Sequence, residues 1–269
     1  MATIDTVRQM EPDARAPIGW DGQTLKQMLT ESEAVFAQTG HYHGLERLAL
    51  KERDPLHFEK LFSRVRGGMV SSRETALNIS ASPIVRELGE ISFALYTPEG
   101  DNVALSTGII VHVHTMSEAI KFMVRNGWED NPGIRPGDIF ANNQPTIGDV
   151  HNADVQTFVP IFWEDELIAW AGGVIHVMDI GASTPGGVCV APTTRFDDGI
   201  DLHCMKIGEK DTIAQWHVKR VSMQSRAPGL YILDERTRLA GCHMIRDTVE
   251  RLVLEEGIAD FKQLSLIHI

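Results

Sequence analysis

The amino-acid sequence predicts an α+β protein in which helices come first, strands fill the middle and helices return at the end. Residues 24–39 place apolar side chains on one helical face, and Gly40 follows as a helix stop. From Pro83 onward, short runs rich in β-branched and aromatic residues predict strands. Helical periodicity resumes near residue 230 and ends at Gly257. This order indicates separate helical and β regions rather than alternating βαβ units.

Local signals define the other elements. Asp54 and Pro55 predict an N-cap and the first residue of a helix, which the pair Gly67–Gly68 is expected to weaken. Thr115 and Glu118 have the spacing of a capping box for a later helix. Extended segments are expected at residues 91–97, 102–105, 106–114, 139–143, 155–163, 166–177, 188–192 and 200–208.

Charge and composition exclude several classes of protein. The chain has 25 basic and 37 acidic residues, a net charge of -12, so it lacks the basic surface that binds nucleic acid. Its three cysteines are widely spaced and include no C-x-x-C pair, so a zinc ribbon or thioredoxin-like motif is excluded. The N-terminus has no apolar signal, and no apolar stretch is long enough for a membrane span. We therefore expect a cytoplasmic protein without a membrane partner.

The two ends differ from the rest of the chain. Residues 1–20 are polar and contain two prolines, which predicts an extended or mobile arm. The last six letters, "LSLIHI", match one reading frame of a sequencing-library adaptor. We expect residues 264–269 to be non-native and residues 21–263 to be the front part of a longer catalytic subunit. The alternative is a short apolar tail that docks on a partner.

The spacing His-x-x-Asp occurs twice around a predicted hairpin, at His151 and Asp154 and again at His176 and Asp179. A turn at Glu164–Asp165 makes paired positions sum to 329, so His176 would lie opposite residue 153, between His151 and Asp154. Opposed strand residues lie about 4.5–5.5 Å apart at Cβ. His151, Asp154 and His176 can therefore converge, provided that the first two lie in a loop just before the strand.

Two imidazoles and a carboxylate form a ligand set for a divalent transition ion with open positions, and iron, zinc and manganese all accept it. Asp179 is a candidate fourth ligand, or a group that orients an imidazole from outside the ligand set. The alternative is that these histidines are only hydrogen-bonded. His112 and His114 would share one strand face and could bind a metal or pack beneath the following helix. His114 is expected to pack, and His112 is also a candidate catalytic residue. Residues 184–187 could bind an anion or form a plain turn, and nucleotide-binding glycine motifs are absent from the sequence.

Long segments also carry a resemblance to a known family. The runs "SPIVRELGEISFALYTPEGD", "STGIIVHVHTMSEAIKFM", "DIFANNQPTIGDVHNADVQTFVPIFWEDELIAWAGGVIHVMDIGA" and "LDERTRLAGCHMIRDTVE" resemble acetone carboxylase alpha subunits, within the hydantoinase B/oxoprolinase family. The resemblance extends from about Gln23 to Gly257. The letters Asn142-Asn143-Gln144, where hydantoinase-type relatives read Asn-Asp-Pro, favour the ketone carboxylase branch.

The resemblance implies a manganese ion on His151, Asp154 and His176. It also implies a separate ATP-binding beta subunit of the hydantoinase A type and a small gamma subunit. The implied reaction joins acetone and bicarbonate to give acetoacetate, with ATP converted to AMP and phosphate. Two other hypotheses stay open: an ATP-dependent hydrolase of a hydantoin, oxoproline or lactam, and a scaffold whose histidines are structural.

Overall fold

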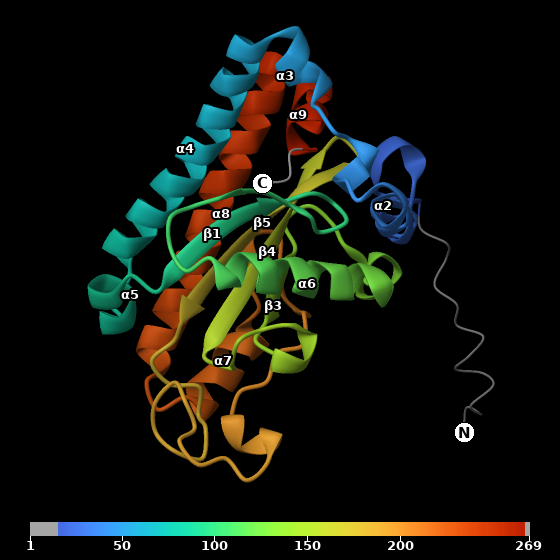
Figure 1. Ribbon diagram of the computed structural model, residues 1–269. Helices are drawn as coiled ribbons and strands as arrows, with labels where there is room; N and C mark the ends of the chain where they lie inside the picture. The colour runs from blue at the N-terminus through green and yellow to red at the C-terminus, as the bar shows by residue number, and fades with distance from the viewer. Residues whose placement is uncertain (1–15, 267–269) are drawn as a thin grey trace, which may run out of the picture.

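A single antiparallel sheet is the centre of the structure, a computed structural model that describes residues 16–266 (Figure 1). Its seven strands have the order β2-β1-β5-β4-β3-β6-β7. The strands are β1 (Ile91–Tyr96), β2 (Asn102–Leu105), β3 (Ile139–Asn142), β4 (Asp154–Trp163), β5 (Glu166–His176), β6 (Met205–Glu209) and β7 (Thr212–Ile213). The hairpin of β4 and β5 therefore lies in the middle of the sheet, where both its faces are covered.

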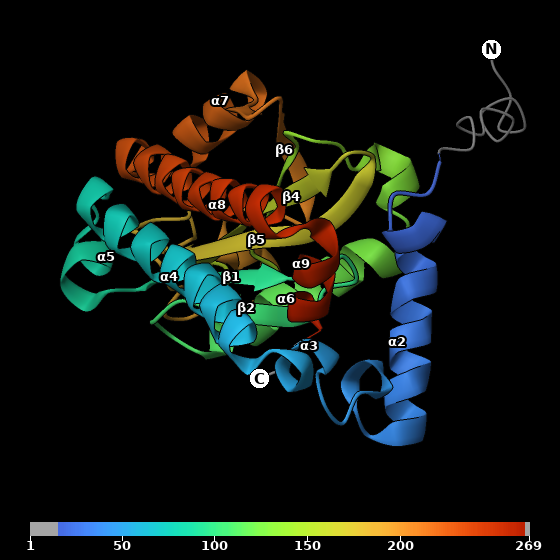
Figure 2. The ribbon, with the colours of Figure 1, turned by 90° about the horizontal axis from the view of Figure 1, so that it is seen from above.

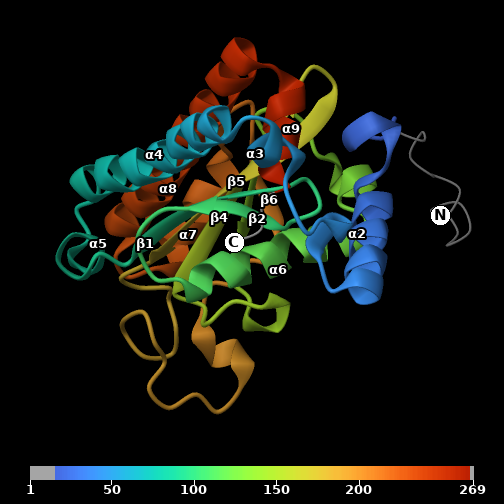
Figure 3. The ribbon, with the colours of Figure 1, turned by 45° about the horizontal axis from the view of Figure 1, so that its top comes forward.

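Helices cover both faces of the sheet. They are α2 (Leu25–Thr39), α3 (Ala49–Arg53), α4 (Pro55–Ile79), α5 (Pro83–Leu88), α6 (Val111–Arg125), α7 (Gln215–Gln224), α8 (Pro228–Glu256) and α9 (Ile258–Ser265). Figure 2 shows α4 and α8 side by side against one face, where they share a hydrophobic core with β1, β4 and β5. The opposite face packs against α6 and α2, both labelled in the tilted view of Figure 3. The predicted α+β class is confirmed.

Several predicted boundaries are confirmed by the local chemistry. The side chain of Thr24 caps α2, and Gly40 ends it with a φ of 71°. The carboxylate of Asp54 accepts a hydrogen bond from the His57 N–H at the start of α4. Gly257 ends α8. Within the described residues, no helix is long and apolar enough to cross a lipid bilayer.

The strand predicted at residues 106–114 is wrong, because α6 begins at Val111. Its β-branched letters predict extended structure, but Met116, Ile120 and Met123 form an apolar stripe at helical spacing that packs on the sheet. Tertiary burial outweighs the modest helix cost of a β-branched residue. The capping box is also wrong: Thr115 lies inside the helix, and its hydroxyl donates to the His112 carbonyl.

The glycine pair in α4 does not interrupt the helix, which runs unbroken from Pro55 to Ile79. Gly68 faces α8, where an added Cβ would lie 2.7 Å from Cγ2 of Thr248. A small residue is therefore needed for the two helices to approach closely. Gly67, by contrast, has no atom within 4 Å of an added Cβ.

The strand predicted at residues 188–192 is also wrong, because the chain between β5 and β6 is irregular there. Only the second half of the segment predicted at 200–208 is a strand, β6. Residues 1–15 of the predicted arm and 267–269 of the predicted tail lie outside the described residues. The carbonyl of Ile18 accepts a hydrogen bond from the Leu167 N–H, and Leu264 is buried in α9. The non-native origin of residues 264–269 stays a prediction.

Candidate metal centre

The β4–β5 hairpin has a register different from the predicted one. The two-residue turn at Glu164–Asp165 pairs Trp163 with Glu166, as expected. An irregularity between Ile161 and Phe162 then shifts the pairing by one residue. His176 consequently lies opposite Asp154 and not opposite residue 153. A bulge of this kind moves every later side chain on one strand relative to its partner.

The shift brings the three predicted ligands together. Asp154 and His176 lie at the end of the ladder as a directly opposed pair. His151 lies in the turn just before β4, where its carbonyl accepts a hydrogen bond from the Asp154 N–H. Its Nε2 is 3.3 Å from Oδ2 of Asp154, and the His151 and His176 ring centroids are 4.9 Å apart. One ligand atom from each residue lies within 4.8 Å of the other two.

Burial shifts the protonation of this group. Asp154 is only 3% exposed, and burial, followed by the charge of Glu90, raises the pKa of its carboxyl to about 7. Burial also lowers the pKa of His151 and of His176. Both imidazoles are therefore neutral at physiological pH, the form that binds a metal. Nδ1 of His176 has no hydrogen-bond partner among the described residues. The donor set thus suits a divalent ion.

His112 and Asp149 extend the polar group beneath α6. His112 lies in the first turn of that helix, and its Nε2 is 3.9 Å from Oδ1 of Asp154. Oδ1 of Asp149 accepts hydrogen bonds from the Val150 N–H and the Gln156 side chain. Burial, as the largest effect, raises the Asp149 pKa to about 8 and lowers the His112 pKa to about 4. Together His112, Asp149 and Asp154 form another group whose ligand atoms converge within 4.8 Å.

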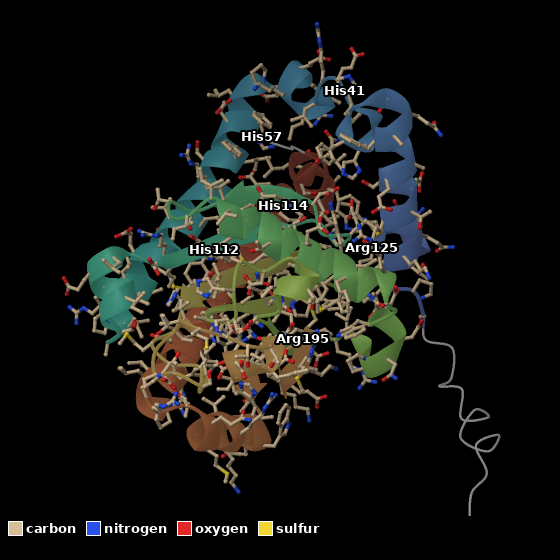
Figure 4. All side chains as sticks on the ribbon, turned by 60° about the horizontal axis from the view of Figure 1, so that its bottom comes forward. His41, His57, His112, His114, Arg125 and Arg195 are labelled. Carbon is tan, nitrogen blue, oxygen red and sulfur yellow. The ribbon has the colours of Figure 1, made fainter. Side chains whose placement is uncertain are left out.

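The other histidine of this segment, His114, points away from the group. Figure 4 labels both His112 and His114 on α6, and only His112 is buried. The prediction that His114 packs beneath the helix is wrong, because a two-residue separation on a helix turns the side chain to another face.

Asparagine and glutamine side chains hold the surrounding loop in place. The Asn143 side chain donates to the carbonyls of Asn152 and Ile200, 2.8 Å away in each case. The Asn142 side chain donates to Gln156, which in turn donates to the Thr115 hydroxyl. These contacts connect β3, β4 and α6 around the candidate ligands. Sequence analysis missed Asp149 and Gln156, although Asp149 stands only two letters before His151.

The His-x-x-Asp spacing suggests Asp179 as a ligand or as a group that orients an imidazole. In the structure its carboxylate binds the N–H groups of nearby loop segments. It accepts hydrogen bonds from the N–H groups of Gly181, Gly186 and Arg226, and from the Arg226 guanidinium. These donors hold its pKa below the ordinary value, although burial acts in the opposite direction. The loop that Asp179 closes packs against the candidate ligand His176, since a Cβ added to Gly187 would meet Cε1 of its ring at 2.5 Å. Because the Gly186 N–H donates to Asp179, a plain turn describes residues 184–187 better than an anion site.

Comparison with known proteins identifies the family. A family model described as hydantoinase B/oxoprolinase matches residues 54–265. The chain belongs to this hydantoinase B/oxoprolinase family. Among curated members, it is 51% identical to the acetone carboxylase alpha subunit of Xanthobacter autotrophicus over 88% of this chain and 30% of that protein. It is 31% identical to the acetophenone carboxylase delta subunit of Aromatoleum aromaticum, over 77% of this chain and 30% of that protein.

Two solved structures have a similar fold. A nucleotide-free acetone carboxylase structure superposes with a TM-score of 0.91 at 48% identity, covering 94% of this chain and 33% of that one. An ATP-dependent caprolactamase from Pseudomonas jessenii superposes with a TM-score of 0.70 at 17% identity over 79% of this chain and 36% of that one, a likeness of fold alone. The chain spans about a third of the length of these relatives.

Proposed function

We propose that this chain forms the metal-binding part of the alpha subunit of an ATP-dependent ketone carboxylase. The substrates would be acetone and bicarbonate and the product acetoacetate, with ATP converted to AMP and phosphate. The observation that carries the proposal is the convergence of His151, Asp154 and His176 in a chain 51% identical to an acetone carboxylase alpha subunit. The nucleotide would bind to a beta subunit of the hydantoinase A type, and a small gamma subunit would complete the complex.

His151, Asp154 and His176 would hold manganese, although their nitrogen and oxygen donors would also accept iron or zinc. When bound, the ion would supply a Lewis acid and a template for phosphorylated oxyanions. His112 faces Asp154 from α6 and is neutral, so it can exchange a proton with a substrate oxygen in the same space. The burial of Asp154 and His112 supports exclusion of water, which would otherwise hydrolyse an activated intermediate.

The test is an assay of the purified complex for ATP consumption and acetoacetate formation. Acetone and bicarbonate should both be required, because each supplies carbon to the product. Removal of metal by a chelator should abolish turnover, and manganese should restore it. Full activity in a complex that metal analysis shows to be metal-free would overturn the proposal.

A hydrolase of a cyclic amide is the second candidate, because 5-oxoprolinases are also relatives; the Dictyostelium discoideum enzyme is 23% identical over 84% of this chain. Such an enzyme would consume ATP with a lactam or hydantoin and without bicarbonate. Under the remaining scaffold hypothesis, metal analysis would find no ion, and substitution of His151, Asp154 and His176 together would leave the complex fully active.

A further inference from the structure

We infer that Gln156 is a positioning residue that sets the distance between His112 and the candidate ligand Asp154. The inference rests on the proposed function, in which His112 exchanges a proton with a substrate oxygen beside the ion that Asp154 holds. It gives a role to a completely buried side chain that the proposed reaction leaves unused.

Gln156 lies on the same strand as Asp154. The two residues are two positions apart on β4, so their side chains lie on the same face of the sheet, beneath α6. The Asn142 side chain donates to Oε1 of Gln156 at 3.0 Å, which fixes the orientation of the amide. Nε2 of Gln156 therefore faces its other two neighbours, Thr115 and Asp149.

Thr115 connects Gln156 to the helical turn that carries His112. Nε2 of Gln156 donates to the Thr115 hydroxyl at 3.0 Å, and that hydroxyl donates to the His112 carbonyl at 3.0 Å. The Tyr96 hydroxyl also holds this turn, but it does so from β1, by donating to the Val113 carbonyl. The contact through Thr115 therefore ties the first turn of α6 directly to β4.

The same nitrogen of Gln156 also holds the loop before β4. It donates to Oδ1 of Asp149 at 3.1 Å, so one side chain keeps both the helix and this loop in a fixed relation to the strand. From these two segments His112 and Asp149 approach Asp154, and one side-chain atom of each residue lies within 4.8 Å of the other two.

Proton transfer at this site should be sensitive to small shifts. Nε2 of His112 lies 3.9 Å from Oδ1 of Asp154, and a misplacement of about 1 Å can cost about 100-fold in rate. Buried polar groups are normally hydrogen-bonded, so the groups that lose the Gln156 amide would move toward new partners. Removal of that amide should therefore let the first turn of α6 shift or open.

Two variants of nearly unchanged shape test the inference in the full-length protein within its native complex. Gln156→Met removes the amide, and Thr115→Val removes the hydroxyl that the amide contacts. Each variant should keep its manganese and a KM within about threefold of wild type, but lower kcat by about tenfold or more, because the reacting groups bind and no longer align. The double variant should be no worse than Gln156→Met alone, since both changes break one relay.

Peptide-resolved hydrogen exchange of the metal-free protein gives a measurement that does not depend on activity. Amides of residues 111–116 should exchange about fivefold faster or more in both variants, because the first turn of α6 opens more often. Ser117→Ala is the matched control, since the hydroxyl of Ser117 is another buried hydroxyl of α6 and donates to the Gly100 carbonyl. It should leave both kcat and the exchange of residues 111–116 unchanged.

The outcomes separate this inference from the proposed function. Wild-type kcat and exchange in both single variants, or a double variant whose loss is the product of the two single losses, would overturn the positioning role. If the wild-type complex shows no ketone-dependent turnover, the proposed function fails, and the exchange of residues 111–116 still decides whether Gln156 holds the turn of His112. If Gln156→Met does not fold, Thr115→Val supplies both measurements.

Discussion

Asp154 and His176 face each other across the β4–β5 ladder because an irregularity at Ile161–Phe162 shifts the pairing by one residue. Both side chains therefore lie on the face of the sheet that α6 covers. A uniform hairpin would have placed His176 opposite residue 153, whose side chain is directed to the other face. The convergence of the candidate ligands thus depends on an irregularity in the ladder several residues away.

Replacement of His176 is the first test of the site. His176→Ala should lower the manganese content of the purified complex to near zero, because it removes one of three converging donors. His114→Ala, an exposed histidine of α6, should retain the wild-type content. The measurement is elemental analysis per chain after dialysis, and equal manganese in both variants would exclude His176 as a ligand.

Metal affinity should depend on pH through Asp154. The ion must displace a proton from this carboxyl, whose pKa is raised to about 7 by burial and then by Glu90. Affinity should therefore rise about tenfold per pH unit below that value and level off above it. The imidazoles of His151 and His176 have lowered pKa values, so they do not compete near neutral pH.

Calorimetric titration with manganese in two buffers of different ionisation heat measures this dependence. Proton release should be close to one per ion at about pH 6 and should decrease toward about pH 8, if Asp154 is the titrating ligand. An affinity that stays constant over this range, with no proton release, would contradict the assignment.

Asp179 should contribute to stability and, indirectly, to metal binding. Its pKa is lowered in the folded protein, so its contribution is complete above its unfolded pKa, about 3.9, and is lost as pH falls through the folded value. Asp179→Asn should cost about 2 kcal/mol of unfolding free energy at neutral pH, since several N–H donors lose a charged acceptor. It should also weaken metal binding about tenfold, because the loop that packs on His176 is released.

Urea unfolding and metal titration measure these two effects of Asp179→Asn. The exposed Asp165 of the hairpin turn is a matched control, and Asp165→Asn should change stability by less than about 0.5 kcal/mol. Unchanged stability in Asp179→Asn across the whole pH range would show that the loop does not depend on this carboxylate.

The adjacent glycines of α4 should respond in opposite directions to the same substitution. Gly68→Ala forces a Cβ against Thr248 and should cost about 1–3 kcal/mol of unfolding free energy. Gly67→Ala meets no neighbour and should stabilise the helix by about 0.5–1 kcal/mol. Thermal or urea unfolding of the two variants tests this, and Gly68→Ala/Thr248→Ala should recover part of the loss. Equal effects at both positions would contradict the close packing of α4 on α8.

Much of this protein could be predicted from its sequence, because the relevant signals act over short distances. The helix ends at Gly40 and Gly257 and the N-cap at Asp54 are local hydrogen-bonding and backbone effects. The hairpin turn and the candidate set His151, Asp154 and His176 follow from spacing along one continuous segment. Turn and cap chemistry is local, so it can be recognised without knowledge of the fold.

Tertiary structure decided the features that depend on packing between distant segments. The helical state of residues 111–114 is set by burial of α6 against the sheet, which outweighs β-branched propensity. The approach of His112 to Asp154 and the packing of Gly68 on Thr248 both bring together segments far apart in the chain. The one-residue register shift lies within the hairpin, but the spacing of its residues did not predict it. Contacts between distant segments depend on where the folded chain places them, so the spacing of residues along the sequence does not predict them.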